Sequence, residues 1–165
     1  MRHKAIDEFQ LIHLNKHVCF ALYTASHAYT QIYSEKLSEV GLNYEQYLVM
    51  MVLWQEQHQT LQGIADRLNL DITTLMLILI SLENAKLVER QRGNQHDPVV
   101  VVALTMLGNQ IQYKTSQLQH EMACETGLTD LELVELREKL DKLLDNFKTR
   151  VQRPDEWVKN LPAGL

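Results

Sequence analysis

Apolar and polar residues recur with a helical period over most of the first eighty positions. From Ile6 to Val40 the apolar positions repeat at intervals of three and four, no Gly or Pro interrupts them, and Gly41 follows as a stop signal. We therefore expect one long helix over 6–40. A second helix is expected over 43–57, with Asn43 as its N-cap.

Two shorter helices are expected next. Thr60 is the predicted N-cap of a helix over 61–70, and Asp71 or Asn69 is the predicted N-cap of a helix that ends at Asn84. The fourth helix has an apolar face sufficient for a core, made by Leu75, Ile78, Leu79 and Leu82. Its opposite face holds further apolar residues, which include Met76, Leu77 and Ile80.

The period changes after residue 84. Residues 86–92 and 99–105 are short β-prone runs, and 93–98 between them, "GNQHDP", are rich in turn formers. This pattern predicts a β-hairpin. Three helices followed by a hairpin form a winged helix-turn-helix, so the predicted fold class is mainly α with a small β-hairpin wing.

Helical spacing resumes over 105–125 and breaks near Gly127. Thr129 and Glu132 form a predicted capping box that opens a last helix, and seven apolar residues lie along one stripe of it: Leu133, Leu136, Leu140, Leu143, Leu144, Phe147 and Val151. An amphipathic helix of this length needs a covering surface. We expect the two terminal helices to pack together with those of a second copy.

The expected organisation is one domain over 1–165. Its parts are a winged helix-turn-helix lobe over 41–105, dimerisation helices over 5–40 and 106–153, and a tail over 154–165. No apolar run approaches the ~18 residues that a membrane span needs, and no secretory signal is recognised. The expected compartment is the cytoplasm, with no membrane partner.

Composition and motifs argue against catalysis and against a cofactor. The sequence contains no catalytic triad, P-loop or dinucleotide fingerprint, so we do not expect an enzyme. His13 and His17 are four residues apart but have no third ligand in view, so no metal site is predicted. The two cysteines, Cys19 and Cys124, are too few and too distant for a disulfide framework.

The arrangement resembles the MarR family of winged-helix transcription regulators, over roughly residues 10–150. The closer resemblance is to its organic-hydroperoxide-sensing branch, through "CFALY" at 19–23 and "LNYEQYLVMMVLW" at 42–54. The resemblance implies a homodimer that binds double-stranded DNA and a redox-sensing cysteine whose sulfur accepts hydrogen bonds from tyrosines. The matching residues are Cys19, Tyr23, Tyr33 and Tyr44, and Cys124 lies where some members carry a resolving cysteine.

Helix geometry constrains this proposed sensor. Tyr23 stands one turn after Cys19 on the same helix face. Tyr33 is fourteen residues beyond Cys19, which is ~21 Å along a straight helix. Tyr33 therefore cannot reach the thiol of its own chain, and the family resemblance implies that Tyr33 and Tyr44 approach the partner's thiol, at the dimer interface. The alternative is that Cys19 is a small apolar residue on a buried face.

The DNA-binding lobe departs from the family in its charge. Residues 41–105 contain four basic and seven acidic side chains, a net charge of −3, which disfavours approach to phosphates. Ile80 and Ser81 occupy places where the family carries Lys or Arg, and after Asp97 of the wing, Pro98 and Val99 replace the expected arginines.

Two interpretations remain for the lobe. In the first, the protein binds DNA through the hydroxyls of Thr73 and Thr74, apolar contacts to thymine methyl groups, and phosphate contacts from Arg90 and Arg92. In the second, it has lost operator binding, and an exposed patch docks a protein partner in a redox-responsive way. That patch would consist of Met76, Leu77 and Ile80, unless the chain itself covers them.

Overall fold

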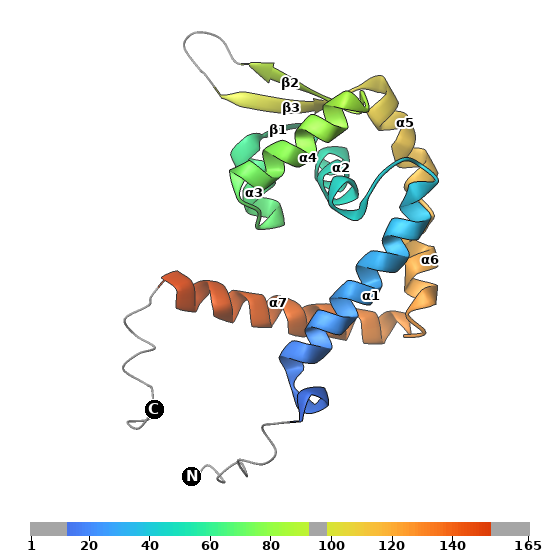
Figure 1. Ribbon diagram of the computed structural model, residues 1–165, viewed down its shortest axis with the longest axis vertical. Coiled ribbons are helices and arrows are strands. Elements are labelled where there is room, and N and C mark those ends of the chain that lie inside the picture. The colour runs from blue at the N-terminus through green and yellow to red at the C-terminus, as the bar shows by residue number, and fades with distance from the viewer. Residues whose placement is uncertain (1–12, 93–98, 153–165) are drawn as a thin grey trace. The chain divides into compact units, whose positions relative to one another are not determined.

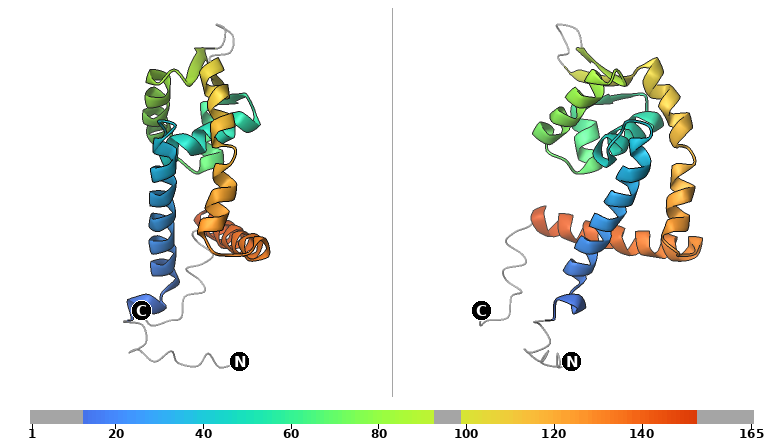
Figure 2. Two further views of the ribbon diagram at one scale, coloured as in Figure 1. Left: turned by 90° about the vertical axis from the view of Figure 1, so that its right-hand side faces the viewer. Right: turned by 45° about the vertical axis from the view of Figure 1, so that its right-hand side comes forward.

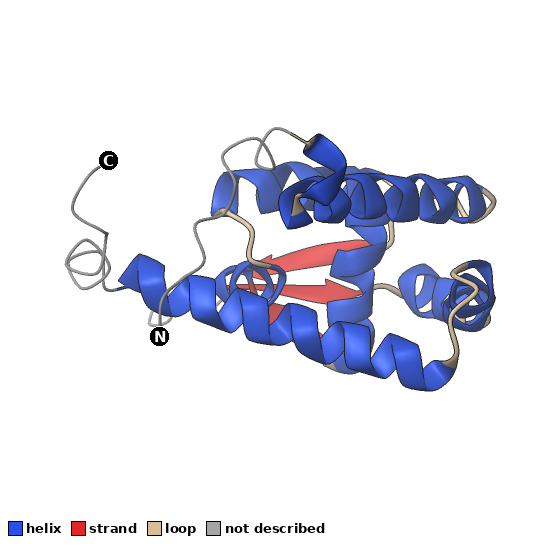
Figure 3. Ribbon diagram, turned by 90° about the horizontal axis from the view of Figure 1, so that it is seen from below, coloured by secondary structure: helices blue, strands red, loops and turns tan. Residues whose placement is uncertain are grey.

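The computed structural model describes residues 13–92 and 99–152. The elements, in chain order, are η2 (Leu14–Lys16), α1 (Val18–Ser38), α2 (Tyr44–Gln55), β1 (His58–Thr60), α3 (Leu61–Leu68), α4 (Ile72–Asn84), β2 (Val88–Arg92), β3 (Val100–Leu104), α5 (Met106–Thr115), α6 (Leu118–Glu125) and α7 (Asp130–Gln152). Helices make up most of the chain, and the strands form one small sheet (Figures 1 and 3). The contacts group into two compact units, Met1–Leu118 and Gln119–Leu165.

The sheet confirms the predicted hairpin and adds a third strand. β2 and β3 pair antiparallel, with Val88 opposite Leu104. β1 joins the other edge of β3, with Thr60 opposite Val101, so the spatial order is β1, β3, β2. β1 was not predicted, because three polar residues between two helices are too few to show an alternating pattern.

Side-chain caps explain where the helices of the lobe begin. Asn43 and Gln46 form a reciprocal capping box at the start of α2, with both bonds 2.8 Å long. The Thr60 hydroxyl accepts a bond of 3.0 Å from the amide of Gly63 and caps α3. Asp71 caps α4, and the three predicted N-caps of the lobe are thus confirmed. Asn69 instead ends α3 in a left-handed conformation.

The core of the first unit lies where α1, α2, α3, α4 and the sheet meet. The predicted inner face of α4 is confirmed, since Leu75, Ile78, Leu79 and Leu82 are all buried. Leu37 of α1 and Leu53 of α2 are fully buried in the same unit. Removing such side chains from water stabilises the fold by roughly 1.5–3 kcal/mol each.

A close junction joins the wing to α5. The Thr105 hydroxyl caps α5 through the amide of Gly108 and donates a bond of 2.7 Å to the Lys86 carbonyl. Trp54 Nε1 donates a bond of 3.0 Å to the Gly108 carbonyl. A Cβ atom at Gly108 would lie only 2.1 Å from the Leu87 carbonyl oxygen, so this close approach requires glycine.

The first helix is shorter than predicted. α1 begins at Val18, after a 3₁₀ turn whose flanking residues His13 and His17 are extended, and residues 6–12 lie outside the described residues. The absence of Gly and Pro permits a helix but does not stabilise one, and no residue from 13 to 32 is buried. Only Tyr33 and Leu37 of α1 are buried, near its C-terminal end, where the helix meets the lobe (Figure 2).

The predicted helix over 105–125 divides into α5 and α6. The hydroxyls of Thr115 and Ser116 donate to carbonyls of the preceding turn, with Ser116 Oγ 2.8 Å from the Tyr113 oxygen. Hydrogen bonds of this kind compete with continued helix, and periodicity alone does not reveal such a break. None of the helices described for residues 13–92 and 99–152 is long and apolar enough to cross a membrane.

The second unit contains α7, whose predicted capping box is confirmed. Glu132 Oε2 accepts from the amide and the hydroxyl of Thr129, at 2.8 and 2.7 Å, and these bonds hold the pKa of the Glu132 carboxyl below its ordinary value. Three residues of the predicted stripe are exposed in the single chain, and three are half-buried. The exposed ones are Leu136, Leu144 and Phe147, and the half-buried ones are Leu133, Leu140 and Leu143.

Candidate functional site

Cys19 lies in the first turn of α1, and its side chain is exposed. Tyr23, one turn later, is 70% exposed, and its ring stacks on that of His27 at a centroid distance of 6.3 Å. None of the residues that the structure describes forms a hydrogen bond with the Cys19 thiol. In the single chain, Cys19 is thus an accessible thiol and not a core residue.

Tyr33 and Tyr44 come together away from Cys19. Their ring centroids are 5.1 Å apart, and Tyr29 and Tyr47 lie 5.0 and 5.8 Å from Tyr33. Burial, and then a hydrogen bond with Tyr29, raise the pKa of the Tyr33 phenol well above its ordinary value. Burial also raises the pKa of Tyr44. Both phenols, like those of ordinary tyrosines, can donate hydrogen bonds at neutral pH.

The structure thus splits the four predicted sensor residues into two pairs. Cys19 and Tyr23 lie on the exposed part of α1, while Tyr33 is 7% exposed and packs with Tyr44 of α2. Cys19 and Tyr33 are both in α1, so the helix rise alone separates them by roughly 21 Å. Within one chain the tyrosine pair does not approach the thiol.

The second cysteine lies on α6. Cys124 is a free, exposed thiol, and its sulfur is 4.0 Å from Nε2 of His120, one helical turn earlier. The sequence analysis named Cys124 but not His120. The interval of four residues between them on a helix was the signal that could have identified the pair.

The N-terminus of α4 uses one of the two predicted threonines as part of its cap. Asp71 accepts from the amide and from the hydroxyl of Thr74, at 2.9 and 2.6 Å. These bonds from Thr74 hold the pKa of the Asp71 carboxyl below its ordinary value. The Thr74 hydroxyl is therefore engaged within the helix cap, whereas Thr73 is exposed.

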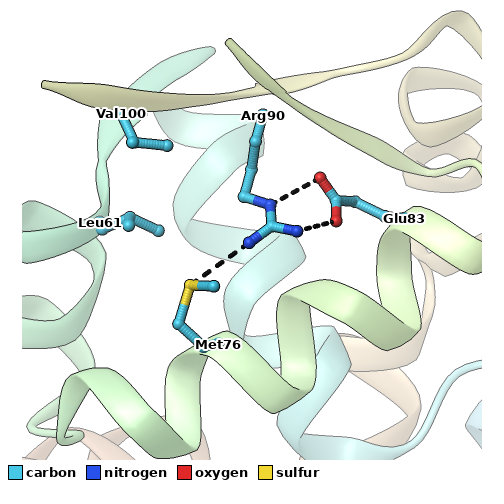
Figure 4. A pocket seen from close by; sticks show the side chains of 5 residues that line it. All are labelled: Leu61, Met76, Glu83, Arg90 and Val100. Atoms are coloured by element: carbon cyan, nitrogen blue, oxygen red, sulfur yellow. Dashed lines mark hydrogen bonds and ion pairs between the residues drawn. The ribbon is translucent and has the colours of Figure 1, made fainter. Parts of the chain in front are cut away.

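Arg90, predicted to contact phosphates, instead binds a carboxylate of α4. Its Nε and Nη2 donate to the two oxygens of Glu83, at 2.7 and 2.6 Å (Figure 4). This hydrogen bonding raises the pKa of the Arg90 guanidinium above its ordinary value. A bidentate pair of this kind fixes the orientation of both groups, so Arg90 joins β2 to α4 in the described state.

The same contact involves one residue of the predicted apolar patch. Arg90 Nη1 lies 3.5 Å from the sulfur of Met76, and Met76 is only half-exposed. These side chains line a pocket of about 350 Å³ together with Leu61, Glu83 and Val100 (Figure 4). Leu77 and Ile80 remain 67% and 43% exposed. We call these two residues the α4 outer face.

Of the other described cations of the lobe, Lys86 is exposed and Arg67 is engaged by neighbouring side chains. Arg67 donates to the Gln55 side chain at 2.6 Å and forms an ion pair with Glu56 at 3.5 Å. The side chain of Arg92 and the wing loop 93–98, which includes Asp97 and Pro98, lie outside the described residues. Among those described, no group of three or more His, Cys, Asp or Glu side chains is arranged to hold a metal ion.

A family comparison agrees with this architecture. Residues 31–118 match the family described as the transcriptional regulator SarA/Rot. The chain belongs to the SarA/Rot family of transcriptional regulators. Its fold is the MarR-type winged helix, and the predicted relationship to the hydroperoxide-sensing branch is confirmed by the relatives of this SarA/Rot chain.

Three relatives of this SarA/Rot protein are informative. The chain is 35% identical over 137 residues to the HTH-type transcriptional regulator TtmR of Methylorubrum extorquens, across 83% of this chain and 70% of TtmR. It is 27% identical to the organic hydroperoxide resistance transcriptional regulator of Bacillus subtilis, across 86% and 96% of the two chains.

The third relative is AbfR of Staphylococcus epidermidis, solved in several states. Reduced AbfR bound to DNA superposes with a TM-score of 0.69 at 32% identity and covers 85% of this chain and 97% of AbfR. The disulfide form of AbfR superposes with a TM-score of 0.58 at 28% identity and covers 88% and 97%.

Proposed function

We propose that this SarA/Rot protein is a DNA-binding regulator whose activity responds to oxidation of Cys19 by an organic hydroperoxide. The observation that carries the proposal is an exposed thiol in the first turn of α1, accompanied in the fold by a pair of tyrosines, Tyr33 and Tyr44, that stay protonated. The relative from B. subtilis is named for organic hydroperoxide resistance, and AbfR is known in reduced and disulfide states, which supports the same chemistry here.

The reaction at Cys19 is a two-electron oxidation. The Cys19 thiolate attacks the terminal oxygen of the hydroperoxide, an S–O bond forms and the O–O bond breaks. The departing alkoxide takes a proton and leaves as an alcohol, while the sulfur becomes a sulfenic acid. In this proposal the Cys124 thiol of the partner then condenses with that sulfenic acid, which gives a disulfide and water.

The functional unit in this proposal is a homodimer. The tyrosine pair lies too far along α1 to contact the thiol of its own chain, so a second copy is needed to bring phenol and sulfur together. The exposed apolar side chains of α7, such as Leu144 and Phe147, support this assembly, because a face of this kind is stabilised when a second copy covers it.

DNA contact in this proposal centres on α4. Thr73 offers an exposed hydroxyl, and the α4 outer face, Leu77 and Ile80, offers methyl groups that suit thymine. Because Arg90 and Arg67 form ion pairs with Glu83 and Glu56, fewer cations are available to bind phosphates than on a strongly basic DNA-binding surface. We expect the affinity to be modest and its salt dependence to be shallow, because few phosphates are neutralised.

A second candidate function rests on the same helix. The α4 outer face is apolar and α4 contains no Lys or Arg, which suits a protein partner better than a polyanion. In this alternative the chain is a redox-responsive protein-interaction module. The two candidates differ in one measurable property, which is affinity for duplex DNA.

The sensor proposal is tested by treating the reduced protein with one equivalent of an organic hydroperoxide and mapping the products by mass spectrometry. We expect a Cys19 sulfenic acid, trapped by dimedone in the Cys124→Ser variant, and an interchain Cys19 to Cys124 crosslink in the wild type. The Cys19→Ser variant is the control and should give neither product. An unmodified Cys19 under these conditions would contradict the proposal.

A further inference from the structure

The pair formed by His120 and Cys124 on α6 has a geometry suited to proton transfer. The sulfur and Nε2 are 4.0 Å apart, which is within hydrogen-bonding range for sulfur, and both residues are exposed. The interval of four residues places both side chains on one face of the helix, so α6 holds the imidazole within reach of the Cys124 sulfur.

A resolving thiol needs such a partner. The thiolate, and not the thiol, is the nucleophile that forms a disulfide, and only a minority of an ordinary cysteine is ionised at neutral pH. Glu121 and Glu125 directly follow His120 and Cys124 in the sequence, so a thiolate here forms in an acidic stretch. An imidazolium at His120 supplies the counter-charge for it.

We propose that His120 is the general base that activates Cys124 as the resolving nucleophile. This inference rests on the proposed function, in which Cys19 is first oxidised. His120 Nε2 takes the thiol proton of Cys124, and the thiolate attacks the sulfenic sulfur of the partner's Cys19. The S–S bond forms as the S–O bond breaks. The departing hydroxide takes the proton from the imidazolium and leaves as water, which restores neutral His120.

In this step the two sulfurs reach the same oxidation level, and no further oxidant or reductant is needed. The sulfenic sulfur of Cys19 is reduced to the level of a disulfide, and the Cys124 sulfur is oxidised to the same level. Because the base lies next to the resolving thiol, it acts on disulfide formation and not on the oxidation of Cys19. Oxidation of Cys19 does not require His120, whereas the formation of the disulfide does.

The first test needs no hydroperoxide and so is independent of the sensor proposal. Alkylation of Cys124 by iodoacetamide is followed in the Cys19→Ser chain at neutral pH, with and without His120→Gln. We expect His120→Gln to slow alkylation about tenfold, as loss of an activating imidazole does. Added imidazole should partly restore the rate at neutral pH.

Two matched controls accompany this test. Glu121→Gln changes the adjacent residue and removes a charge, and it should not slow the alkylation. Cys19, followed in the Cys124→Ser chain, should react at the same rate with and without His120→Gln. Glutamine is a good helix former and His120 is exposed, so the variant should keep the fold. An unchanged alkylation rate for Cys124 in His120→Gln would overturn the inference.

The second test follows the disulfide step after one equivalent of an organic hydroperoxide. In His120→Gln we expect Cys19 sulfenic acid to appear at the wild-type rate and the interchain disulfide to form about tenfold more slowly. If Cys19 is never oxidised, the proposed function fails while the alkylation result still stands. If Cys19 is oxidised and the disulfide forms equally fast in both proteins, the role of His120 is wrong.

Discussion

α4 and α7 have similar apolar rows but different surroundings in the single chain. The inner row of α4, which includes Leu75 and Leu79, is fully buried by the chain itself. In α7, Leu144 and Phe147 are 53% and 52% exposed. Apolar periodicity therefore predicts a face that needs covering, but not which chain covers it. We interpret α4 as part of a self-contained lobe and α7 as half of an interface.

The largest effect should come from the inner row of α4. Leu79→Ala should lower the free energy of unfolding by about 2–5 kcal/mol, because it leaves a cavity in a packed core. Leu77→Ala, two residues earlier on the α4 outer face, should change it by less than about 0.5 kcal/mol. Urea unfolding measured by circular dichroism checks both. Equal losses in the two variants would mean that the outer face is covered after all.

The second effect concerns α7. The double substitution Leu144→Ala and Phe147→Ala should weaken the dimer about 100-fold, since each deletes a large apolar contact at the proposed interface. Analytical ultracentrifugation over a range of concentrations measures the dissociation constant. Glu135→Ala with Lys139→Ala is the control, because this exposed ion pair of the same helix, 3.9 Å long, should contribute little. If the wild-type chain remains monomeric, the proposed dimer interface at α7 is wrong.

A third effect tests the bond between Arg90 and Glu83. Glu83→Gln should free the guanidinium for phosphate and so tighten DNA binding several-fold, with a salt dependence steeper by about one phosphate contact. Glu89→Gln gives the same change in net charge, but Glu89 accepts a hydrogen bond from Gln91 and is not a partner of Arg90. Fluorescence anisotropy at several salt concentrations distinguishes the two variants. Identical behaviour would show that net charge alone matters.

The smallest effect is the pH dependence of the α4 cap. Since the folded pKa of Asp71 is lowered, its ionised cap stabilises the fold above the ordinary carboxyl value near 3.8 and loses this contribution as the pH falls through the lowered value. Asp71→Asn keeps an acceptor oxygen and lacks this titration. The difference in urea midpoint between the two proteins should therefore be larger at pH 6 than at pH 2.5. A constant difference would show that the cap charge has no role.

Features of the fold that depend on local sequence could be predicted. The caps at Asn43, Thr60 and Asp71, the buried row of α4 and the hairpin all follow from spacing and side-chain chemistry, and each is confirmed. The strand β1 and the division of α5 from α6 were missed. They depend on pairing with β3 and on hydroxyl groups that bond to the preceding turn, and neither leaves a periodic signal.

The contacts of the candidate site could be predicted from the sequence less well than the fold. The proposed sensor residues were predicted from a family resemblance, and their joint role stays a proposal. They are Cys19, Tyr23, Tyr33, Tyr44 and Cys124. The bond between Arg90 and Glu83 could not be inferred, because seven residues and a change from helix to strand separate the two side chains. This pairing also explains why Met76 is half-exposed and does not belong to the α4 outer face.

The proposal that oxidation of Cys19 controls DNA binding can be tested by measuring the affinity for DNA before and after oxidation. Fluorescence anisotropy of a labelled duplex from the promoter of the protein's own gene is measured at low salt with reduced protein, and again after one equivalent of an organic hydroperoxide. We expect binding at micromolar protein or below and an affinity that oxidation changes at least tenfold, about 1.4 kcal/mol, in the wild type but not in Cys19→Ser. No binding by the reduced protein, or the same response in Cys19→Ser, would contradict the account.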